Sequence, residues 1–169
     1  MALPKIDTPT FMLELPSTKE NVKYRPFTVK EEKILLMASQ SEDEKDIQNA
    51  IEQILTNCII SDINVKTLAP YDIEYLFLNL RAKSVNNIIE LKITDDEDNI
   101  EYEISINLDD IKITMPERNN IIQINDSISL IMKDPDYATV KKLEKKSEDQ
   151  VMNSILIECI DQILVDDDV

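Results

Sequence analysis

The spacing of apolar residues changes near Asn86, and this change limits the possible folds more than any other feature of the sequence. Before it, apolar residues recur every three or four positions, the spacing of an amphipathic helix. After it, apolar and polar residues alternate along 89–93 and 100–108, with an acidic turn between them. Such alternation is typical of a β-hairpin with one aliphatic face, which must lie against something. The sequence therefore predicts an α+β fold.

On this basis we predict two subregions, residues 1–85 and 86–169. The first is expected to hold an N-terminal β-hairpin and a helical middle, after an extended arm at 1–9. The second is expected to hold an antiparallel β-hairpin or small sheet and C-terminal helices. The strands predicted for the first subregion are 10–15 and 21–27, and its helices are 29–39, 42–59 and 68–85.

Helix starts are indicated by capping boxes, in which two side chains satisfy amides of the first turn. The pairs with this spacing are Thr28 with Glu31, Ser41 with Glu44, and Ser147 with Gln150. The last pair opens a helix predicted over 148–165, and Asp134 is the predicted N-cap of a short helix at 136–146. Shorter extended segments are predicted at 111–115, 121–124 and 127–132.

The chain contains neither glycine nor histidine. Without glycine it lacks phosphate-cradling loops, dinucleotide fingerprints and nucleophile elbows. Without histidine it lacks the usual acid–base catalyst and the Ser-His and Cys-His nucleophile pairs. We therefore predict no enzymatic activity, no catalytic residues and no cofactor, and we expect turns to rely on Asn, Asp, Ser and Pro.

The net charge is −16, from 18 basic and 34 acidic residues. Such a charge repels phosphate backbones and anionic membranes, so neither nucleic acid nor a membrane is an expected partner. We interpret the acidity as an aid to solubility, with steering towards a basic partner as the alternative. Cys58 and Cys159 each lie in an apolar helical run and are expected to be buried free thiols rather than a disulfide.

Two acidic clusters, at 95–99 and 166–168, contain carboxylates of the kind that bind hard cations. The first has neither the spacing nor the bending glycine of an EF-hand, and we interpret it as a solvated hairpin tip. The second is interpreted as a solvated chain end. We predict no metal site.

Three segments together resemble a known family. They are the turn Pro16–Thr18, the run KYRPFTVKEEKILLMA that begins at Lys23, and DIEYLFLNLRAKSV from Asp72 to Val85. They are similar to the baseplate hub assembly proteins of T4-like contractile-tailed bacteriophages, closely over the first half of the chain and in outline beyond it. Many relatives carry Cys-x-x-Cys pairs resembling a zinc ribbon where this chain has its acidic hairpin, so their absence here implies that no zinc is bound.

The resemblance implies a non-enzymatic tail protein that acts in baseplate hub assembly, as a chaperone, a structural component or both. It implies hub proteins and the tape-measure protein as partners, with the chain located in the tail baseplate or in the host cytoplasm during assembly. A homo-oligomer within the baseplate is compatible with this role. The alternative is an acidic adaptor or nucleic-acid mimic that inhibits a host DNA-binding protein.

Eight residues are predicted to bind protein partners. Tyrosine and arginine are enriched at interface cores, whereas Phe27 and Phe77 are expected in this chain's own core. In the helix predicted over 148–165, one apolar line is expected to pack on the sheet and a second is left for a hub partner or a second copy. The predicted partner-binding residues are Tyr24, Arg25, Tyr75, Arg81, Met152, Leu156, Ile160 and Leu164.

Overall fold

The computed structural model of the chain describes residues 8–41, 43–95, 99–117, 119–143 and 148–165. Within these residues, helices alternate with small antiparallel sheets of two, two and three strands, which confirms the predicted α+β class. The chain divides into two compact units, Met1–Ile63 with Glu74–Ile113 and Asn64–Ile73 with Thr114–Val169. The first unit therefore includes residues on both sides of the division predicted at residue 86.

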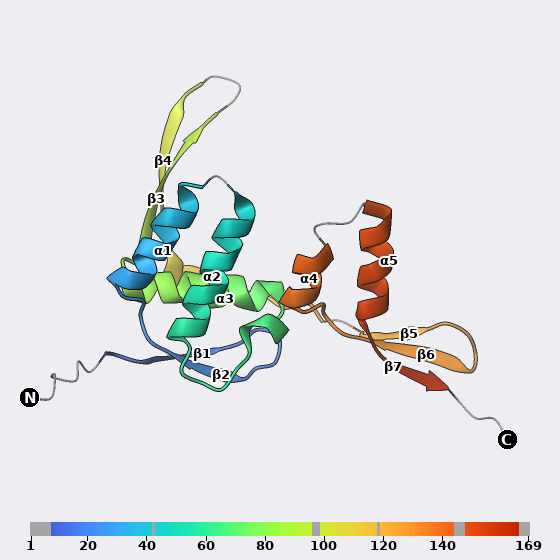
Figure 1. The fold of residues 1–169 in the computed structure, drawn as a ribbon. Helices are drawn as coiled ribbons and strands as arrows, with labels where there is room; N and C mark the ends of the chain where they lie inside the picture. Colours follow the sequence, from blue (N-terminus) through green and yellow to red (C-terminus); the bar gives the residue numbers. More distant parts are fainter. Residues whose placement is uncertain (1–7, 42, 96–98, 118, 144–147, 166–169) are drawn as a thin grey trace, which may run out of the picture. The chain divides into compact units, whose positions relative to one another are not determined.

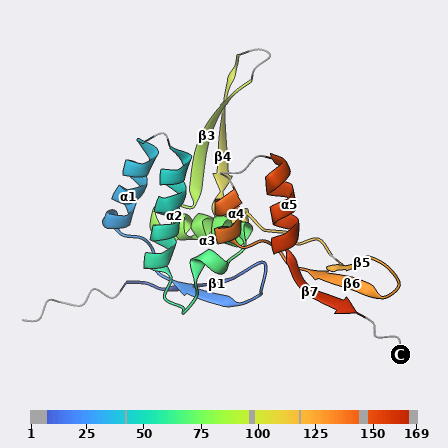
Figure 2. The same ribbon diagram turned by 45° about the vertical axis from the view of Figure 1, so that its right-hand side comes forward.

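Among its described residues, the first unit contains two hairpins and three helices, which Figures 1 and 2 show from two sides. Its elements are β1 (Phe11–Glu14), β2 (Asn21–Tyr24), α1 (Val29–Ser39), α2 (Glu44–Cys58), α3 (Pro70–Ser84, whose first residues belong to the second unit), β3 (Ile88–Thr94), β4 (Glu101–Asn107) and the 3₁₀ turn Leu108–Asp110. The β1–β2 hairpin and the helix α1 confirm the predicted N-terminal elements. The buried apolar side chains include Leu15, Val22, Tyr24, Ile54, Leu55, Cys58, Leu76 and Leu80.

The end of α2 is attached to β2 by backbone hydrogen bonds. The Arg25 amide donates to the Cys58 carbonyl at 3.0 Å, and the Ile60 amide donates to the Lys23 carbonyl at 2.8 Å. These bonds continue the β1–β2 pairing onto the segment that follows α2, where Tyr24 bridges Ile59. The first hairpin and the second helix therefore share one buried layer.

The capping box predicted at Thr28 is present, and Glu31 accepts the Thr28 amide at 2.8 Å. The box predicted at Ser41 is wrong. Asp43 caps α2 by accepting the Lys45 amide at 2.9 Å, while the Ser41 hydroxyl donates backwards to the carbonyl of Ala38 at 2.8 Å. Ser41 thus closes α1, and its hydroxyl is engaged before α2 begins.

Asparagine side chains form many of the turns in this glycine-free chain, as expected. In each case the side-chain oxygen accepts an amide two residues later, at 2.9 to 3.1 Å; the acceptors are Asn64, Asn86, Asn107, Asn119 and Asn125. Among the described residues, the left-handed backbone conformation occurs at Asn99, with φ 57°, and at Lys19, with φ 62°. Asparagine tolerates this conformation better than most residues, whereas lysine has no local compensation for it.

The β3–β4 hairpin confirms the clearest prediction from residue alternation. Its register sets Ile89 opposite Ile106, Leu91 opposite Ile104 and Ile93 opposite Tyr102, so these six side chains share one face. The other face carries Lys92, which pairs with Glu101 at 3.3 Å and Glu103 at 3.4 Å. Of the acidic tip, residues 96–98 lie outside the described residues.

The second unit contains a 3₁₀ turn, a three-stranded sheet and two helices. Its elements are the turn Val65–Thr67, β5 (Ile121–Gln123), β6 (Ile128–Met132), α4 (Tyr137–Leu143), α5 (Glu148–Glu158) and β7 (Ile160–Val165), with strand order β5-β6-β7. Asp136, not the predicted Asp134, caps α4 by accepting the Thr139 amide at 2.7 Å. Asp134 instead accepts the hydroxyl of Tyr71 at 2.8 Å.

The helix predicted over 148–165 is half wrong. It ends at Glu158, and Ile160–Val165 forms β7, paired antiparallel with β6. The apolar residues Ile160, Ile163 and Val165 fit the spacing of a helix and also that of a strand. They are β-branched, which suits a strand, and pairing with the open edge of β6 selects that structure. The segment 111–115, predicted as extended, forms no strand, and the capping box at Ser147 lies outside the described residues.

Candidate functional site

The first predicted partner-binding residues, Tyr24 and Arg25, lie at the end of β2, where Arg25 makes several hydrogen bonds. Tyr24 is only 3% exposed. Arg25 donates to Glu31 and to the carbonyl of Asn57, both at 3.1 Å, and to the carbonyl of Pro26 at 2.9 Å. The guanidinium therefore joins β2, α1 and α2 within this chain.

Electrostatics in this cluster follow from its burial. Burial alone would raise the pKa of Glu31, but hydrogen bonds from Thr28 and Arg25 outweigh it and lower the pKa to about 2. The carboxylate therefore stays charged beneath the guanidinium. Burial raises the pKa of the Cys58 thiol to about 11, which makes it a poor nucleophile at neutral pH. Both cysteines are free and buried, as predicted.

Tyr24 also interacts electrostatically with Tyr75 of α3 and with Asp109, which follows β4. Burial first, and then the charge of Asp109 and the nearby Tyr75, raise the pKa of Tyr24. Tyr24 also lies 5.9 Å from the ring of Phe11. Tyr75 is half-buried, and Arg81, also half-buried, donates to the Asn86 carbonyl at 3.3 Å.

The four predicted residues in the C-terminal segment divide between helix and strand. Met152 and Leu156 lie one turn apart on α5 and are 63% and 51% exposed. Ile160 is half-buried in β7 opposite Met132, and Leu164 is exposed opposite Ser129. Because the helix ends at Glu158, these residues do not form the single line that the sequence predicted.

An apolar sheet face was missed by the sequence reasoning. Ile122, Leu130 and Ile163 form one cross-strand row, and Ile128 and Val165 form the next row on the same face. Ile122, Ile163 and Val165 are 47%, 62% and 58% exposed. We name these five residues the β5–β7 face. Their alternation with other residues in each strand was the available signal, but reading 160–165 as helix concealed it.

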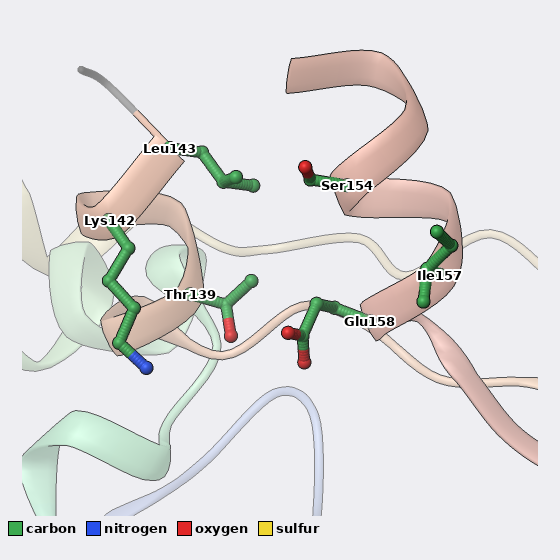
Figure 3. A pocket seen from close by; sticks show the side chains of 6 residues that line it. All are labelled: Thr139, Lys142, Leu143, Ser154, Ile157 and Glu158. Carbon is green, nitrogen blue, oxygen red and sulfur yellow. The ribbon is translucent and has the colours of Figure 1, made fainter. Parts of the chain in front are cut away.

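A small pocket of about 180 Å³ lies between α4 and α5. Figure 3 shows Leu143 of α4 and Ser154 of α5 directed towards each other across it, with Thr139 and Glu158 facing across the other end. Pockets that bind small molecules usually exceed roughly 300 Å³. We therefore assign the pocket no role as a small-molecule site.

The described part of the chain was searched for clustered metal ligands and for membrane-spanning helices. There, Cys, Asp and Glu side chains form no group of three or more that could hold a metal ion. The absence of a metal site stays a prediction, because residues 96–98 and 166–168 of the two acidic clusters lie outside the described residues. No helix with described residues has both the length and the apolar character to cross a membrane.

Comparison with known proteins decides the family. The model of the family described as T4 bacteriophage base plate protein matches residues 8–169, nearly the whole chain. The chain belongs to this family. No curated protein and no solved structure matches it. As a T4-type base plate protein, it is a bacteriophage baseplate component that interacts with other components of the baseplate.

Proposed function

We propose that this base plate protein acts in assembly of the central hub, as an assembly factor and as a structural subunit, through protein–protein contacts and without catalysis. The proposed partners are hub proteins and the tape-measure protein. The proposed sites of action are the virion tail and, during assembly, the host cytoplasm. The observation that carries the proposal is the match of residues 8–169 to the baseplate family.

The exposed apolar surface of the second unit supports a role in binding proteins. Met152 and Leu156 on α5 are apolar side chains more than half exposed to solvent, so a partner protein can reach them. The β5–β7 face adds a second apolar patch in the same unit. Contiguous exposed apolar surface of this kind marks interaction sites in soluble proteins.

The buried predicted residues contribute differently to the proposal. Arg25 holds β2 to α1 and α2, and Tyr24 is buried beside it, so their substitution would act first on the fold of the first unit. Leu164 is exposed in β7 and remains a direct contact in the proposal. Tyr75 and Arg81 in the first unit and Ile160 in the second are half-buried and stay secondary candidates for contact.

The test is a double substitution, Met152→Ser with Leu156→Ser, in a phage that depends on this chain. We expect fewer complete tails and loss of co-purification with separately produced hub proteins, because two apolar contacts are removed. The matched control is Leu36→Ser with Met37→Ser on α1, where the same residue types are 57% and 63% exposed. Circular dichroism melts of both variants establish that the fold persists.

Equal loss in both double variants would contradict a specific role for α5, and normal tails in the α5 variant would contradict any role. Labelling the chain and locating the label in purified tails and assembly intermediates separates this proposal from the alternative. A nucleic-acid mimic would be absent from tails and would bind a host DNA-binding protein instead. The family match favours the tail role.

A further inference from the structure

The pocket between α4 and α5 has apolar walls and a polar end. Its volume is about 180 Å³, and an engineered cavity of about 150 Å³ holds benzene, so the pocket has room for the end of one large side chain. Leu143, which is buried, and Ile157, which is 69% exposed, supply the apolar walls. Thr139 and Glu158 face each other at the polar end (Figure 3). A side chain that fits this lining is apolar along its length and polar at its tip.

The polar end of the pocket offers hydrogen-bond acceptors. The Thr139 hydroxyl donates to the carboxylate of Asp136, so its proton is engaged and its oxygen can accept. Glu158 is exposed and, among the described residues, forms neither a hydrogen bond nor an ion pair. Figure 3 shows the ammonium group of Lys142 beyond Thr139 and away from Glu158. Two acceptors that face each other suit a tip with several N–H donors.

The charges near this end leave one carboxylate without a cation. Around the start of α4 and the end of α5, the carboxylates of Asp134, Asp136 and Glu158 stand against the ammonium groups of Lys133 and Lys142. The last turn of α5, all of it described, contains no basic residue, although the negative end of a helix dipole favours one. A cation bound at Glu158 would balance both the carboxylate and the helix end.

We propose that the α4–α5 pocket receives one arginine side chain of a partner protein, with its guanidinium on Glu158 and Thr139 and its methylene stem along Leu143 and Ile157. Arginine suits the site better than lysine because its planar guanidinium has five donors and can reach a carboxylate and a hydroxyl oxygen together. Arginine is also enriched among the residues that anchor interfaces. The inference rests on the proposed role in binding proteins and names one pocket and one anchoring side chain for it.

The pocket is separate from the surface that Met152 and Leu156 form on the same helix. Successive residues of an α-helix are about 100° apart around its axis. Leu156 is two positions from both Ser154 and Glu158, so it lies on the opposite side of α5 from these two lining residues. The two surfaces can therefore be changed independently.

The probe is N-acetyl-arginine methylamide, and N-acetyl-citrulline methylamide is the uncharged probe of matching shape. Each is titrated into the full chain while NMR records the methyl signals of leucine and isoleucine. We expect saturable shifts at Leu143 and Ile157 with the arginine probe. The citrulline probe should bind at least about tenfold more weakly, because it lacks the charge that strengthens hydrogen bonds to Glu158. Raising the salt concentration should weaken binding of the arginine probe, since the ion pair is exposed to screening.

The variant is Glu158→Gln, which keeps the shape of the side chain and removes its charge. We expect the affinity for the arginine probe to fall by about tenfold, while the affinity for the citrulline probe is unchanged. The matched control is Glu32→Gln at an exposed carboxylate of α1, which should leave both affinities unchanged. Circular dichroism melts of both variants establish that the fold persists.

Three results would overturn the inference: no saturable shift at Leu143 and Ile157, equal binding of the two probes, or an unchanged affinity in the Glu158→Gln variant. A fourth comes from Lys145→Ala with Lys146→Ala. If this double variant binds the arginine probe at least about tenfold more tightly than the unchanged chain, a lysine of the same chain occupies the pocket instead of a partner's arginine.

The titrations use neither phage tails nor hub proteins. Their failure therefore leaves the hub proposal standing. Normal tails from the α5 double variant would contradict the hub proposal, while the titration would still report on the pocket.

Discussion

At the scale of single residues, Glu31 shows how a buried carboxylate is kept charged. Its side chain is 5% exposed, and Arg25 and Thr28 hydrogen-bond to it. The fall in its pKa from 4.5 to about 2 corresponds to about 3 kcal/mol of folding free energy. The sequence identified this residue only as half of a capping box, and the structure adds its ion pair with Arg25.

Glu31→Gln is expected to lower the free energy of unfolding at pH 7 by about 2 kcal/mol, because Arg25 loses its buried partner. The contribution of a carboxylate with a lowered pKa is present above the unfolded-state value near 4.5 and is lost as the pH falls towards about 2. The difference between wild type and variant should therefore shrink over that window. Urea denaturation from pH 7 to pH 2.5 measures it. Glu32→Gln, at an exposed neighbour, is the control, and a constant difference at every pH would contradict the assignment.

The backbone conformation of Lys19 gives a second prediction at this scale. Its φ of 62° places a side chain with a Cβ in the left-handed region, which costs roughly 1–2 kcal/mol. Lys19→Gly is expected to raise the free energy of unfolding by about 0.5–1 kcal/mol, after the larger entropy of glycine in the unfolded chain is subtracted. Lys19→Ala keeps the Cβ and should leave stability almost unchanged. Equal effects in thermal melts of the two variants would show that the lysine side chain, not the backbone, is responsible.

At the scale of elements, the question is which residue caps the start of α2. The sequence favours Ser41 as the cap, whereas the structure assigns that position to Asp43. Asp43→Ala is expected to cost about 1 kcal/mol, the usual value for a lost N-cap. Ser41→Ala should cost less, since its hydroxyl donates to the end of α1 at 2.8 Å and accepts the Asp43 amide only at 3.4 Å. Chemical denaturation of both variants measures the order, and the reverse order would restore the predicted capping box.

At the scale of the whole molecule, the prediction that no metal is bound has a direct consequence for stability. A structural metal adds its binding free energy to folding, so a chelator would lower the melting temperature by several degrees. We expect excess EDTA to leave the melting temperature within about 1 °C of its value without EDTA. Differential scanning calorimetry on protein expressed with and without added zinc measures it. A zinc-dependent rise in melting temperature would contradict the prediction.

The two hairpins and the first helix could be predicted because local rules specify them. The alternation around Leu91 and Ile104 fixes which side chains share a face, and a one-residue slip would reverse every one of them. Thr28 and Glu31 are close enough in sequence to define a helix start without any partner. The lack of glycine likewise pointed to asparagine turns, such as that at Asn86.

The sequence by itself determined the α+β class, the capping box at Thr28 and the apolar face of the second hairpin, since each depends on residues near one another in the chain. Only the tertiary structure decided that Ile160–Val165 pairs with β6 instead of extending α5, because its apolar residues satisfy both periods and a distant strand edge chooses between them. Tertiary structure likewise decided the burial of Tyr24, since that depends on the contacts made by α2 and α3. Which apolar faces stay uncovered is decided at the same level, because alternation shows that a face is apolar but not whether the same chain supplies the layer above it.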